Sequence, residues 1–279
     1  WHSDPMRLVV IDNGSTDESP ARIDAWVSQQ ASTRVRFLRN ADNLGVAAGN
    51  NAGIRWALAR DPQPDFIWLL NNDTRPTRDA LTHLLEAARE RPEIRVWGST
   101  LLEADGETVQ YAGGGYYNPV LSLQTNLYAG LKKQLVVDEE VRVGLDFVCA
   151  ASMLVRAEMF SNALLNEQFF LYYEELDLCR RVTTKGEIAW CPKSMVIHAE
   201  GASTAGSRTG LELRTFHENL STFKFTAIHY RWCLPAVLAV RLLIKPILFI
   251  GRKQWFLLRP LFRAYAQFFR WLANHGGAG

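Results

Sequence analysis

Three carboxylates follow an aromatic run in the second half of the chain. Residues 169–173 read Phe-Phe-Leu-Tyr-Tyr and lead into Glu174, Glu175 and Asp177. Apolar residues then recur at helical spacing, which predicts a helix that begins at the glutamates. The dipole at a helix N-terminus favours negative charge, and the aromatic side chains would limit the access of water. A carboxylate held there is a candidate general base, whereas the alternative is a charged first turn on an ordinary amphipathic helix.

Two predicted strands upstream end in polar turns. Residues 7–11 predict a strand buried on both faces, which ends at Asp12, Asn13 and Ser15. Residues 65–70 predict a second buried strand, which is followed by Asn72 and Asp73. Ligands bind at the carboxyl ends of strands in open α/β sheets. Asp12 is therefore a candidate for hydrogen bonds to a nucleobase or ribose, and Asp73 for binding Mg²⁺ or Mn²⁺ with substrate phosphates. Capping and turn roles are the alternatives for both aspartates.

Two further segments carry candidate ligand-binding residues. Residues 40–53 are small and polar, and they contain Asn43, Gly45 and Asn50 just before and within a predicted helix. Small residues let a backbone approach a ligand closely, although a loop before a closely packed helix is the alternative. His198 ends another predicted strand, and its neutral ring could complete a metal site with Asp73 unless it is a structural histidine. Residues 201–208 predict a loop that closes over a substrate.

The succession of strand, polar turn and helix predicts an α/β fold, with helices flanking a central sheet. The hydrophobic content of 48% and charged content of 22% are those of a globular protein. The four cysteines are widely separated and form no C-x-x-C pair, which predicts reduced thiols and a cytoplasmic location.

Charge is distributed unevenly along the chain. The first 218 residues contain 22 basic and 29 acidic side chains, whereas residues 219–279 contain nine basic and no acidic ones. The acidic body argues against a nucleic-acid partner, and the basic tail favours an anionic one.

The tail, residues 231–279, is predicted to form basic amphipathic helices on a membrane surface. Its longest apolar segment, 234–250, is interrupted by Arg241, Lys245 and Pro246, which argues against a transmembrane helix. Aromatic and basic residues interleave through residues 255–271, as is typical of helices that lie in the headgroup region. A helical hairpin packed on the body is the alternative. The prediction is a peripheral protein on the inner face of the membrane.

Together, these segments resemble the family 2 glycosyltransferases of the GT-A fold, especially the rhamnosyltransferase-like members. Residues 10–17 and 43–53 resemble the two nucleotide-binding segments of the family. Residues 70–73 stand where the family has its D-x-D metal motif, and residues 174–177 stand where it has its E-D-x-D acceptor motif. His198 matches a metal-ligand histidine. The resemblance spans roughly residues 8–230, so we expect a GT-A domain with a mixed central sheet flanked by helices over residues 1–230, and the tail beyond it.

The resemblance implies an inverting, metal-assisted transferase. It would move a sugar such as rhamnose from a dTDP- or UDP-linked donor to a lipid-linked or polysaccharide acceptor. Glu175 aligns with the base, while Glu174 and Asp177 would position the acceptor and the helix. The implied metal ligands are Asp73 and His198. The implied donor-binding residues are Asp12, Asn13, Ser15, Asn43, Gly45, Asn50, Asn72 and Asp73.

The chain departs from the family pattern at three places. Glu175 stands where the family often has Asp, and Asn71 and Asn72 leave one carboxylate in the D-x-D position. The family also begins with a strand and helix before the segment equivalent to Leu8, so we expect the first strand of the sheet to be missing. Two alternatives therefore stay open: a sugar-phosphate nucleotidyltransferase, and a non-catalytic membrane-associated module that binds nucleotide sugars.

Overall fold

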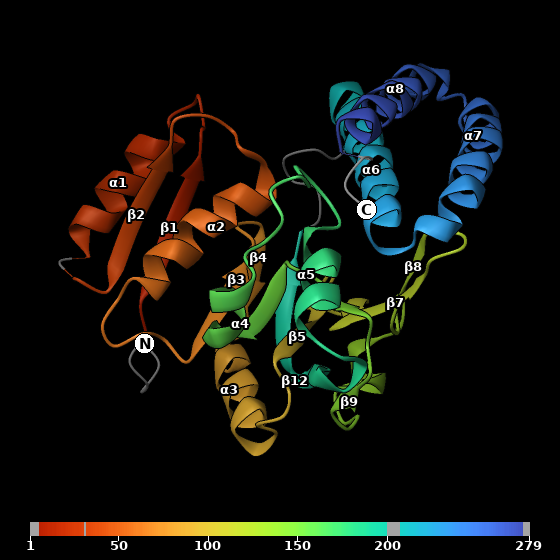
Figure 1. Ribbon diagram of the computed structural model, residues 1–279. Coiled ribbons are helices and arrows are strands. Elements are labelled where there is room, and N and C mark those ends of the chain that lie inside the picture. The colour runs from red at the N-terminus through yellow and green to blue at the C-terminus, as the bar shows by residue number, and fades with distance from the viewer. Residues whose placement is uncertain (1–5, 31, 200–206, 276–279) are drawn as a thin grey trace.

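The computed structural model describes residues 6–30, 32–199 and 207–275, which form a mixed α/β architecture (Figure 1). The strands are β1 (Leu8–Asn13), β2 (Val35–Asn40), β3 (Phe66–Leu70), β4 (Thr74–Pro76), β5 (Val96–Leu102), β6 (Val109–Ala112), β7 (Gly114–Asn118), β8 (Leu123–Asn126), β9 (Arg142–Val143), β10 (Phe147–Val148), β11 (Ser152–Arg156) and β12 (Ile188–His198). The helices are α1 (Ser19–Gln29), α2 (Gly45–Leu58), α3 (Ala80–Glu90), α4 (Ala157–Asn162), α5 (Glu174–Val182), α6 (Arg208–His229), α7 (Leu234–Gly251) and α8 (Leu258–His275).

A seven-stranded mixed sheet forms the centre of the molecule. Its main order is β3-β11-β5-β12-β4, with β6 added to β5 and β9 added to β12. β12 runs parallel to β5, whereas β11 runs antiparallel to both β3 and β5. Every residue of β5 is buried, because β5 lies inside the sheet. The prediction of a mixed central sheet with flanking helices is confirmed.

β1 and β2 form a separate parallel pair, with Leu8 opposite Val35 and Asn13 opposite Asn40. Among the described residues, no ladder joins this pair to the larger sheet. Residues 8–11 are partly buried, so the prediction that this strand is buried on both faces was wrong. The side chains of β1 project from the two faces of a two-stranded sheet, and the helices α1 and α2 that contact it leave them only partly covered.

Helix α2 connects the two sheets by packing against both β1 and β3. Gly53 makes the approach to β1 possible, because a Cβ atom at this position would lie 2.6 Å from Cδ1 of Ile11. The next residue, Ile54, is 1% exposed and belongs to the largest hydrophobic cluster of the molecule. The small residues predicted to allow close approach to a ligand thus also allow close helix–strand packing.

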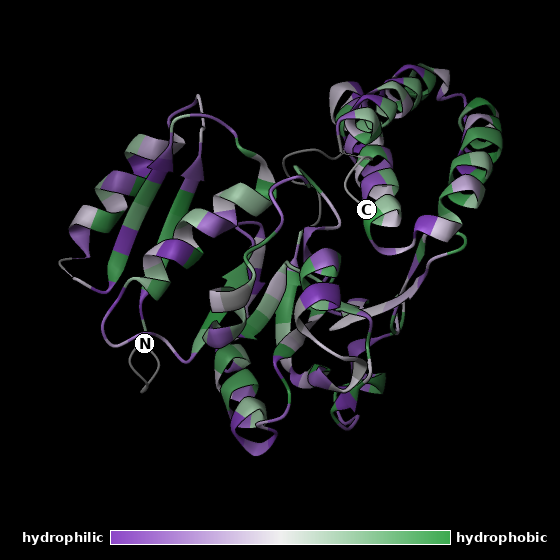
Figure 2. Ribbon diagram, viewed as in Figure 1, coloured by the Kyte–Doolittle hydropathy of each residue, from purple (hydrophilic) through white to green (hydrophobic). Residues whose placement is uncertain are grey.

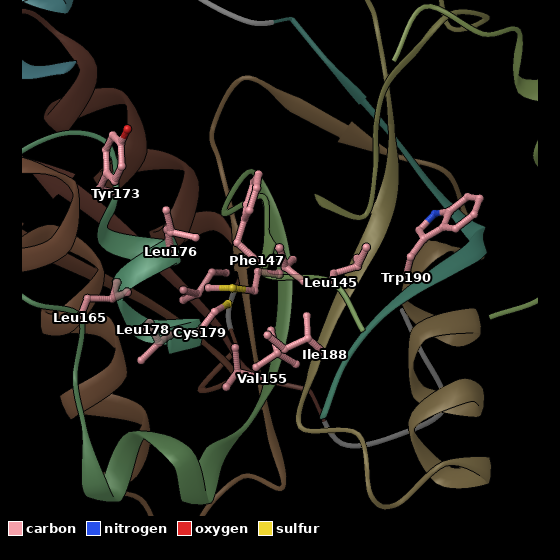
Figure 3. Packing of buried hydrophobic residues seen from close by; sticks show 14 of the residues in the cluster. Leu145, Phe147, Val155, Leu165, Tyr173, Leu176, Leu178, Cys179, Ile188 and Trp190 are labelled. Carbon is pink, nitrogen blue, oxygen red and sulfur yellow. The ribbon is translucent and has the colours of Figure 1, made fainter. Parts of the chain in front are cut away.

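Helix α5 begins at Glu174, as predicted, and its apolar side lies in the main core. Figure 3 shows Leu176 and Cys179 directed toward Phe147 and Val155, which come from β10 and β11. Burial of these side chains fixes the helix over the sheet. All four cysteines carry free thiols, as predicted.

Helices α6, α7 and α8 gather at one end of the molecule (Figure 1). α6 packs along α8, and a second hydrophobic cluster combines Leu220 and Phe223 of α6 with Leu261 and Phe268 of α8. The C-terminal helices therefore share a core with α6.

Candidate active site

Asp12 lies at the carboxyl end of β1 and is almost completely buried, with 3% exposure. Its Oδ2 atom accepts a hydrogen bond from the backbone N–H of Ser15 at 3.2 Å. The guanidinium of Arg39 lies 3.7 Å from the same oxygen. Ser15 therefore contacts Asp12 through its backbone N–H, and this hydrogen bond holds the carboxylate in the turn that follows the strand.

The side chain of Asn13 ties two predicted donor-binding segments together. Its Nδ2 atom donates to the carbonyl of Gly45 at 2.9 Å and to Oδ1 of Asn43 at 3.2 Å. Its Oδ1 atom accepts from Nδ2 of Asn40 at 3.0 Å. Asn50 lies one turn further into α2 and donates to the carbonyl of Val46 at 3.0 Å. The structure thus brings Asn13, Asn43 and Gly45 into one network.

The start of α2 also contacts the aromatic segment that precedes α5. Gly45 has φ +84°, and a Cβ atom at this position would lie 2.5 Å from the carbonyl oxygen of Phe170. The N–H of Val46 donates to that same carbonyl at 2.8 Å. No residue with a side chain fits here without a shift of the backbone. The contact joins the predicted nucleotide-binding segments to the aromatic segment that leads into α5.

Two successive tyrosines adopt left-handed backbone conformations before α5. Tyr172 has φ 67° and Tyr173 has φ 73°, which is unfavourable for residues with a side chain. The hydroxyl of Tyr173 accepts a hydrogen bond from Oγ1 of Thr222 at 3.0 Å and lies 3.3 Å from Oγ of Ser122. The ring packs on Phe225, 5.2 Å between centroids. These contacts hold the strained turn that aims the first residues of α5.

Glu174 and Glu175 carry buried oxygens for which the described residues supply no hydrogen bond. Glu174 is 5% exposed, and burial together with the charge of Glu175 raises its pKa well above the ordinary value. Burial raises the pKa of Glu175 to about 7. We expected the helix dipole to favour the charged forms, but desolvation at this site is the larger effect. Both carboxyls therefore favour the protonated form more than an exposed glutamate does, and a pKa of about 7 leaves Glu175 partly ionised near neutral pH.

Asp177, two residues further on, has a different environment. It is completely buried, and its two oxygens contact Nε of Arg181 at 2.6 Å and Nε2 of His229 at 2.8 Å. Both partners are cationic or can be, so the carboxylate is occupied. Of the two predicted roles, the arrangement favours positioning of the helix over contact with an acceptor.

Asp73 and His198 lie together at the carboxyl ends of β3 and β12. The distance between Oδ1 of Asp73 and Nε2 of His198 is 3.3 Å, and the backbone N–H of Ala199 donates to the Asp73 carbonyl at 3.0 Å. Nδ1 of His198 lies 2.7 Å from Oε1 of Gln110, which can only accept. In the neutral ring, the proton is therefore on Nδ1, and the lone pair of Nε2 faces Asp73.

This pair fits a divalent cation. Oδ1 of Asp73 is buried and receives no hydrogen bond within the described ranges, although it faces a second electron-pair donor. A carboxylate oxygen and an imidazole nitrogen suit Mn²⁺, with further positions left for phosphate oxygens and water. No group of three or more His, Cys, Asp or Glu side chains in the described part of the chain is arranged to hold a metal. Asp73 and His198 would therefore share the ion with the substrate.

The turn at residues 149–151, between β10 and β11, lies between the Asp73 side of the site and α5. β10 packs against α5 and leads into this turn, where the carbonyl of Ala151 accepts from the N–H of Asn71 at 3.1 Å. Asn71 is two residues before Asp73. The neighbouring Asn72 is exposed, whereas Asp73 points inward.

Sequence reasoning did not find three residues of this region: Gln110, His217 and His229. The ring of His217 stacks on Phe170, with 4.6 Å between centroids and 20° between planes. Burial lowers the pKa of His217 to about 4, so the ring is neutral at physiological pH. These residues lie 47 to 88 positions from the partners they contact, and no local pattern marks them. Residues 201–206 of the predicted closing loop lie outside the described residues, and its last two residues cap and begin α6.

Comparison with known proteins gives relatives of one enzymatic class. The chain is 26% identical over 269 residues to the N-acetylglucosaminyl-diphospho-decaprenol L-rhamnosyltransferase of Mycobacterium tuberculosis, covering 85% of this chain and 82% of the relative. It is 25% identical over 193 residues to the low-salt glycan biosynthesis hexosyltransferase Agl10 of Haloferax volcanii. That match covers 68% of this chain and 58% of the relative, so the chain spans little more than half of Agl10.

Solved structures share the fold. The mannosyltransferase PcManGT from Pyrobaculum calidifontis, solved with GDP-Man and Mn²⁺, has a TM-score of 0.53 at 13% identity, covering 94% of this chain and 77% of that one. GalNAc-T7, solved with UDP, GalNAc and Mn²⁺, has a TM-score of 0.54 at 12% identity, covering 84% of this chain and 51% of that one. The fold is therefore that of the GT-A glycosyltransferases, as predicted. The model of glycosyl transferase family 2 matches residues 2–156, more than half of the chain, and the protein belongs to this family.

Proposed function

We propose that this glycosyltransferase moves a sugar, with rhamnose as the first candidate, from a dTDP- or UDP-linked donor to a hydroxyl of a lipid-linked or polysaccharide acceptor, with inversion at the anomeric carbon. One observation carries the proposal. Three buried carboxylate oxygens, from Asp73, Glu174 and Glu175, receive no hydrogen bond from the described residues. Buried polar groups are nearly always paired, so unpaired carboxylates at the ends of functional elements indicate chemistry.

Glu175 is the proposed general base. Its carboxylate takes the proton of the acceptor hydroxyl while the acceptor oxygen bonds to the anomeric carbon from the face opposite the leaving group. The bond between that carbon and the diphosphate oxygen breaks, and its electron pair leaves with the nucleoside diphosphate. A pKa of about 7 suits a base that works near neutral pH. In its protonated form, which burial and the charge of Glu175 favour, Glu174 can donate a hydrogen bond without repelling Glu175.

The donor is proposed to lie along the carboxyl ends of β1 and β3. Asp12 would bind the nucleoside in its buried turn, and the Asn13 network would shape the backbone beside it. Asp73 and His198 would hold Mg²⁺ or Mn²⁺ against the diphosphate. When bound, such an ion neutralises charge on the leaving group. The remaining donor candidates are Ser15, Asn43, Gly45, Asn50 and Asn72.

The acceptor is proposed to be carried on a lipid, with the chain working at the cytoplasmic face of a membrane. The mycobacterial relative is named for a diphospho-decaprenol acceptor. In this chain, the segment 231–251 is long and apolar enough to cross a membrane by length and composition. Only 17% of its most apolar 18-residue stretch is buried in the protein.

A panel of nucleotide sugars tests the proposed reaction. With Mn²⁺ present, the correct donor at 100 times its dissociation constant should stabilise the protein by about 2.7 kcal/mol. Incubation with a lipid-linked glycan should then release a nucleoside diphosphate and give a product whose NMR coupling shows an inverted anomeric centre. Release of pyrophosphate would indicate a nucleotidyltransferase instead. Donor binding without any release would indicate a binding module.

A further inference from the structure

Helix α7 turns its charged residues toward the protein and its apolar residues outward, the reverse of an ordinary surface helix. Its buried residues are Val237, Arg241 and Phe249, and the partly buried Lys245 continues the same line at intervals of four. Both charged side chains of the helix therefore face the body of the protein. The rest of the circumference is apolar and open, with Leu243 65%, Ile247 69% and Ile250 60% exposed. In Figure 2 the helix is predominantly green, the colour of hydrophobic residues.

The inward charges are held by a specific set of contacts. Arg241 donates to Oε1 of Glu218 at 3.2 Å, to Oδ1 of Asn219 at 2.9 Å and to the carbonyl of Ser122 at 3.3 Å. Nζ of Lys245 donates to the same Glu218 oxygen at 3.0 Å. The two cations lower the pKa of Glu218, although burial acts in the opposite direction. The orientation of α7 is thus fixed by ion pairs, and its apolar outer surface is a consequence of that orientation.

Helix α8 provides the contrast. It buries Leu261, Ala264, Tyr265 and Phe268 against α6 and exposes Arg263 and other polar residues, as an amphipathic helix on a soluble body does. We expected the aromatic and basic residues 255–271 to contact the membrane, but most of the apolar side of α8 is already covered. Most of the apolar surface that the two helices leave open belongs to α7.

The ends of α7 carry the residues that favour a lipid headgroup region. Trp232 is 96% exposed just before the helix, and Trp255 is 66% exposed just after it. Arg252 and Lys253 lie between the helix and Trp255, both exposed, and residues 219–279 contain no acidic side chain. Tryptophan and basic residues around an apolar face are typical of the interface of an anionic bilayer.

We propose that the outer face of α7 inserts into one leaflet of an anionic lipid bilayer, with the helix lying along the surface. Crossing the bilayer would carry Arg241 and Lys245 into hydrocarbon or break their contacts with Glu218, and either change is costly. The inference concerns the partner of the proposed lipid-linked reaction, and its test requires no transfer activity.

The contacts of α7 also connect it to the candidate active site. Arg241 binds the carbonyl of Ser122, and Oγ of Ser122 lies 3.3 Å from the hydroxyl of Tyr173, the residue before Glu174. A membrane that holds α7 would therefore hold the carboxylate helix at a defined distance from the lipid surface. An acceptor hydroxyl close to its lipid anchor suits this arrangement.

Vesicle binding by the full chain tests the proposal. We expect co-sedimentation with vesicles that contain phosphatidylglycerol, and at least about tenfold weaker binding to neutral phosphatidylcholine vesicles. The triple variant Leu243→Gln, Ile247→Gln, Ile250→Gln should weaken partitioning by about 100-fold, at roughly 1 kcal/mol for each half-exposed side chain. The matched control is Phe262→Gln with Phe269→Gln on α8, which are 50% and 52% exposed and should leave binding nearly unchanged.

Tryptophan fluorescence of the unmodified chain gives a second readout that does not depend on variants. Lipids brominated near the headgroups should quench more strongly than lipids brominated at the bilayer centre, because Trp232 and Trp255 would lie at the interface. Three results would overturn the proposal: equal binding by the triple variant, equal loss in the α8 control, or self-association without lipid that the triple variant abolishes. The last result would assign the face to a second copy of the chain.

Discussion

Helix α5 places two kinds of buried carboxylate within four residues of each other. Asp177 is completely buried and contacts Arg181 and His229, so its charge is compensated. Glu174 and Glu175 are buried at one oxygen each without a donor among the described residues, and their pKa values are raised. The comparison shows that burial alone does not distinguish a structural carboxylate from a reactive one. We propose that the absence of a compensating partner is what distinguishes Glu174 and Glu175 from the structural carboxylate Asp177.

The largest effect on the transfer rate is expected at Glu175, a carboxylate without a compensating partner. Glu175→Gln preserves the shape of the side chain but removes the base, and a positioned base contributes about 10²–10⁴-fold to the rate. We expect kcat for sugar transfer to fall by about 10³-fold, while donor affinity, measured by calorimetry with Mn²⁺, stays within about twofold. The exposed carboxylate variant Asp138→Asn serves as the control and should transfer normally.

The next effect concerns the cation. Asp73→Asn removes the only carboxylate of the Asp73–His198 pair. Loss of an outer partner of a metal ligand costs 10–100-fold in affinity, so loss of a ligand itself should weaken Mn²⁺ binding by at least about 100-fold. Titration of Mn²⁺ in the presence of the nucleoside diphosphate measures this. Asp79→Asn, at an exposed carboxylate before α3, is the control; unaltered Mn²⁺ affinity in Asp73→Asn would refute the assignment.

A smaller effect on the same ion is expected at Gln110. Gln110→Leu removes the oxygen that holds the Nδ1 proton of His198, so Nε2 no longer has a fixed orientation toward Asp73. We expect Mn²⁺ to bind about tenfold more weakly, in the range known for outer partners. Gln110→Glu retains an acceptor and should recover most of this loss. Equal affinities in the two variants would mean that Gln110 does not orient the histidine.

At Asp177, the carboxylate whose charge is compensated, the main effect of a substitution should be on stability. Asp177→Asn leaves Arg181 and His229 without their carboxylate, and breaking a buried ion pair costs about 3 kcal/mol. Urea denaturation measures the free energy of unfolding, and the folded fraction should keep a transfer rate within about tenfold of the unmodified enzyme. A stable Asp177→Asn protein with no activity would instead place Asp177 among the catalytic groups.

The pH dependence separates the roles of Glu175 in activity and stability. The base must be ionised, so kcat should rise with pH through about 7 and then level off. Stability should change in the opposite sense between the ordinary pKa of 4.5 and about 7, because the folded protein retains a proton that the unfolded chain has released. In Glu175→Gln the fall in stability over this window should become shallower. A rate that is flat from pH 5 to pH 8 would contradict the assignment.

Local patterns were sufficient to predict the elements that carry the candidate residues. The run before Asp12, the small residues around Gly45 and the start of α5 at Glu174 all depend on short-range signals of strand, turn and helix. The mixed sheet was implied by the resemblance that these segments, in this order, bear to the family 2 glycosyltransferases. The depth of burial of β1 could not be predicted in this way, because it depends on which elements cover the two faces of its sheet.

Long-range contacts limited the rest. The contact of Asp177 with His229 joins α5 to α6, and that of His198 with Gln110 joins β12 to β6. No pattern in the local sequence indicates either contact. The tail shows the same limit. Composition predicted helices on a membrane surface. The contact of Arg241 with Glu218 and the packing of α8 on α6, both long-range, determine that most of the open apolar surface is on α7. At the glutamates, the expected effect of the helix dipole was outweighed by desolvation, which requires the surrounding structure.

The most direct test of the central claim is a side-by-side measurement of Glu175→Gln and Asp177→Asn, with donor affinity, transfer rate and unfolding free energy determined for each under the same conditions. We predict opposite results: Glu175→Gln should be folded and able to bind donor but unable to transfer, and Asp177→Asn should be less stable but active while folded. Normal transfer by Glu175→Gln would contradict the claim that an uncompensated carboxylate at the start of α5 removes the acceptor proton.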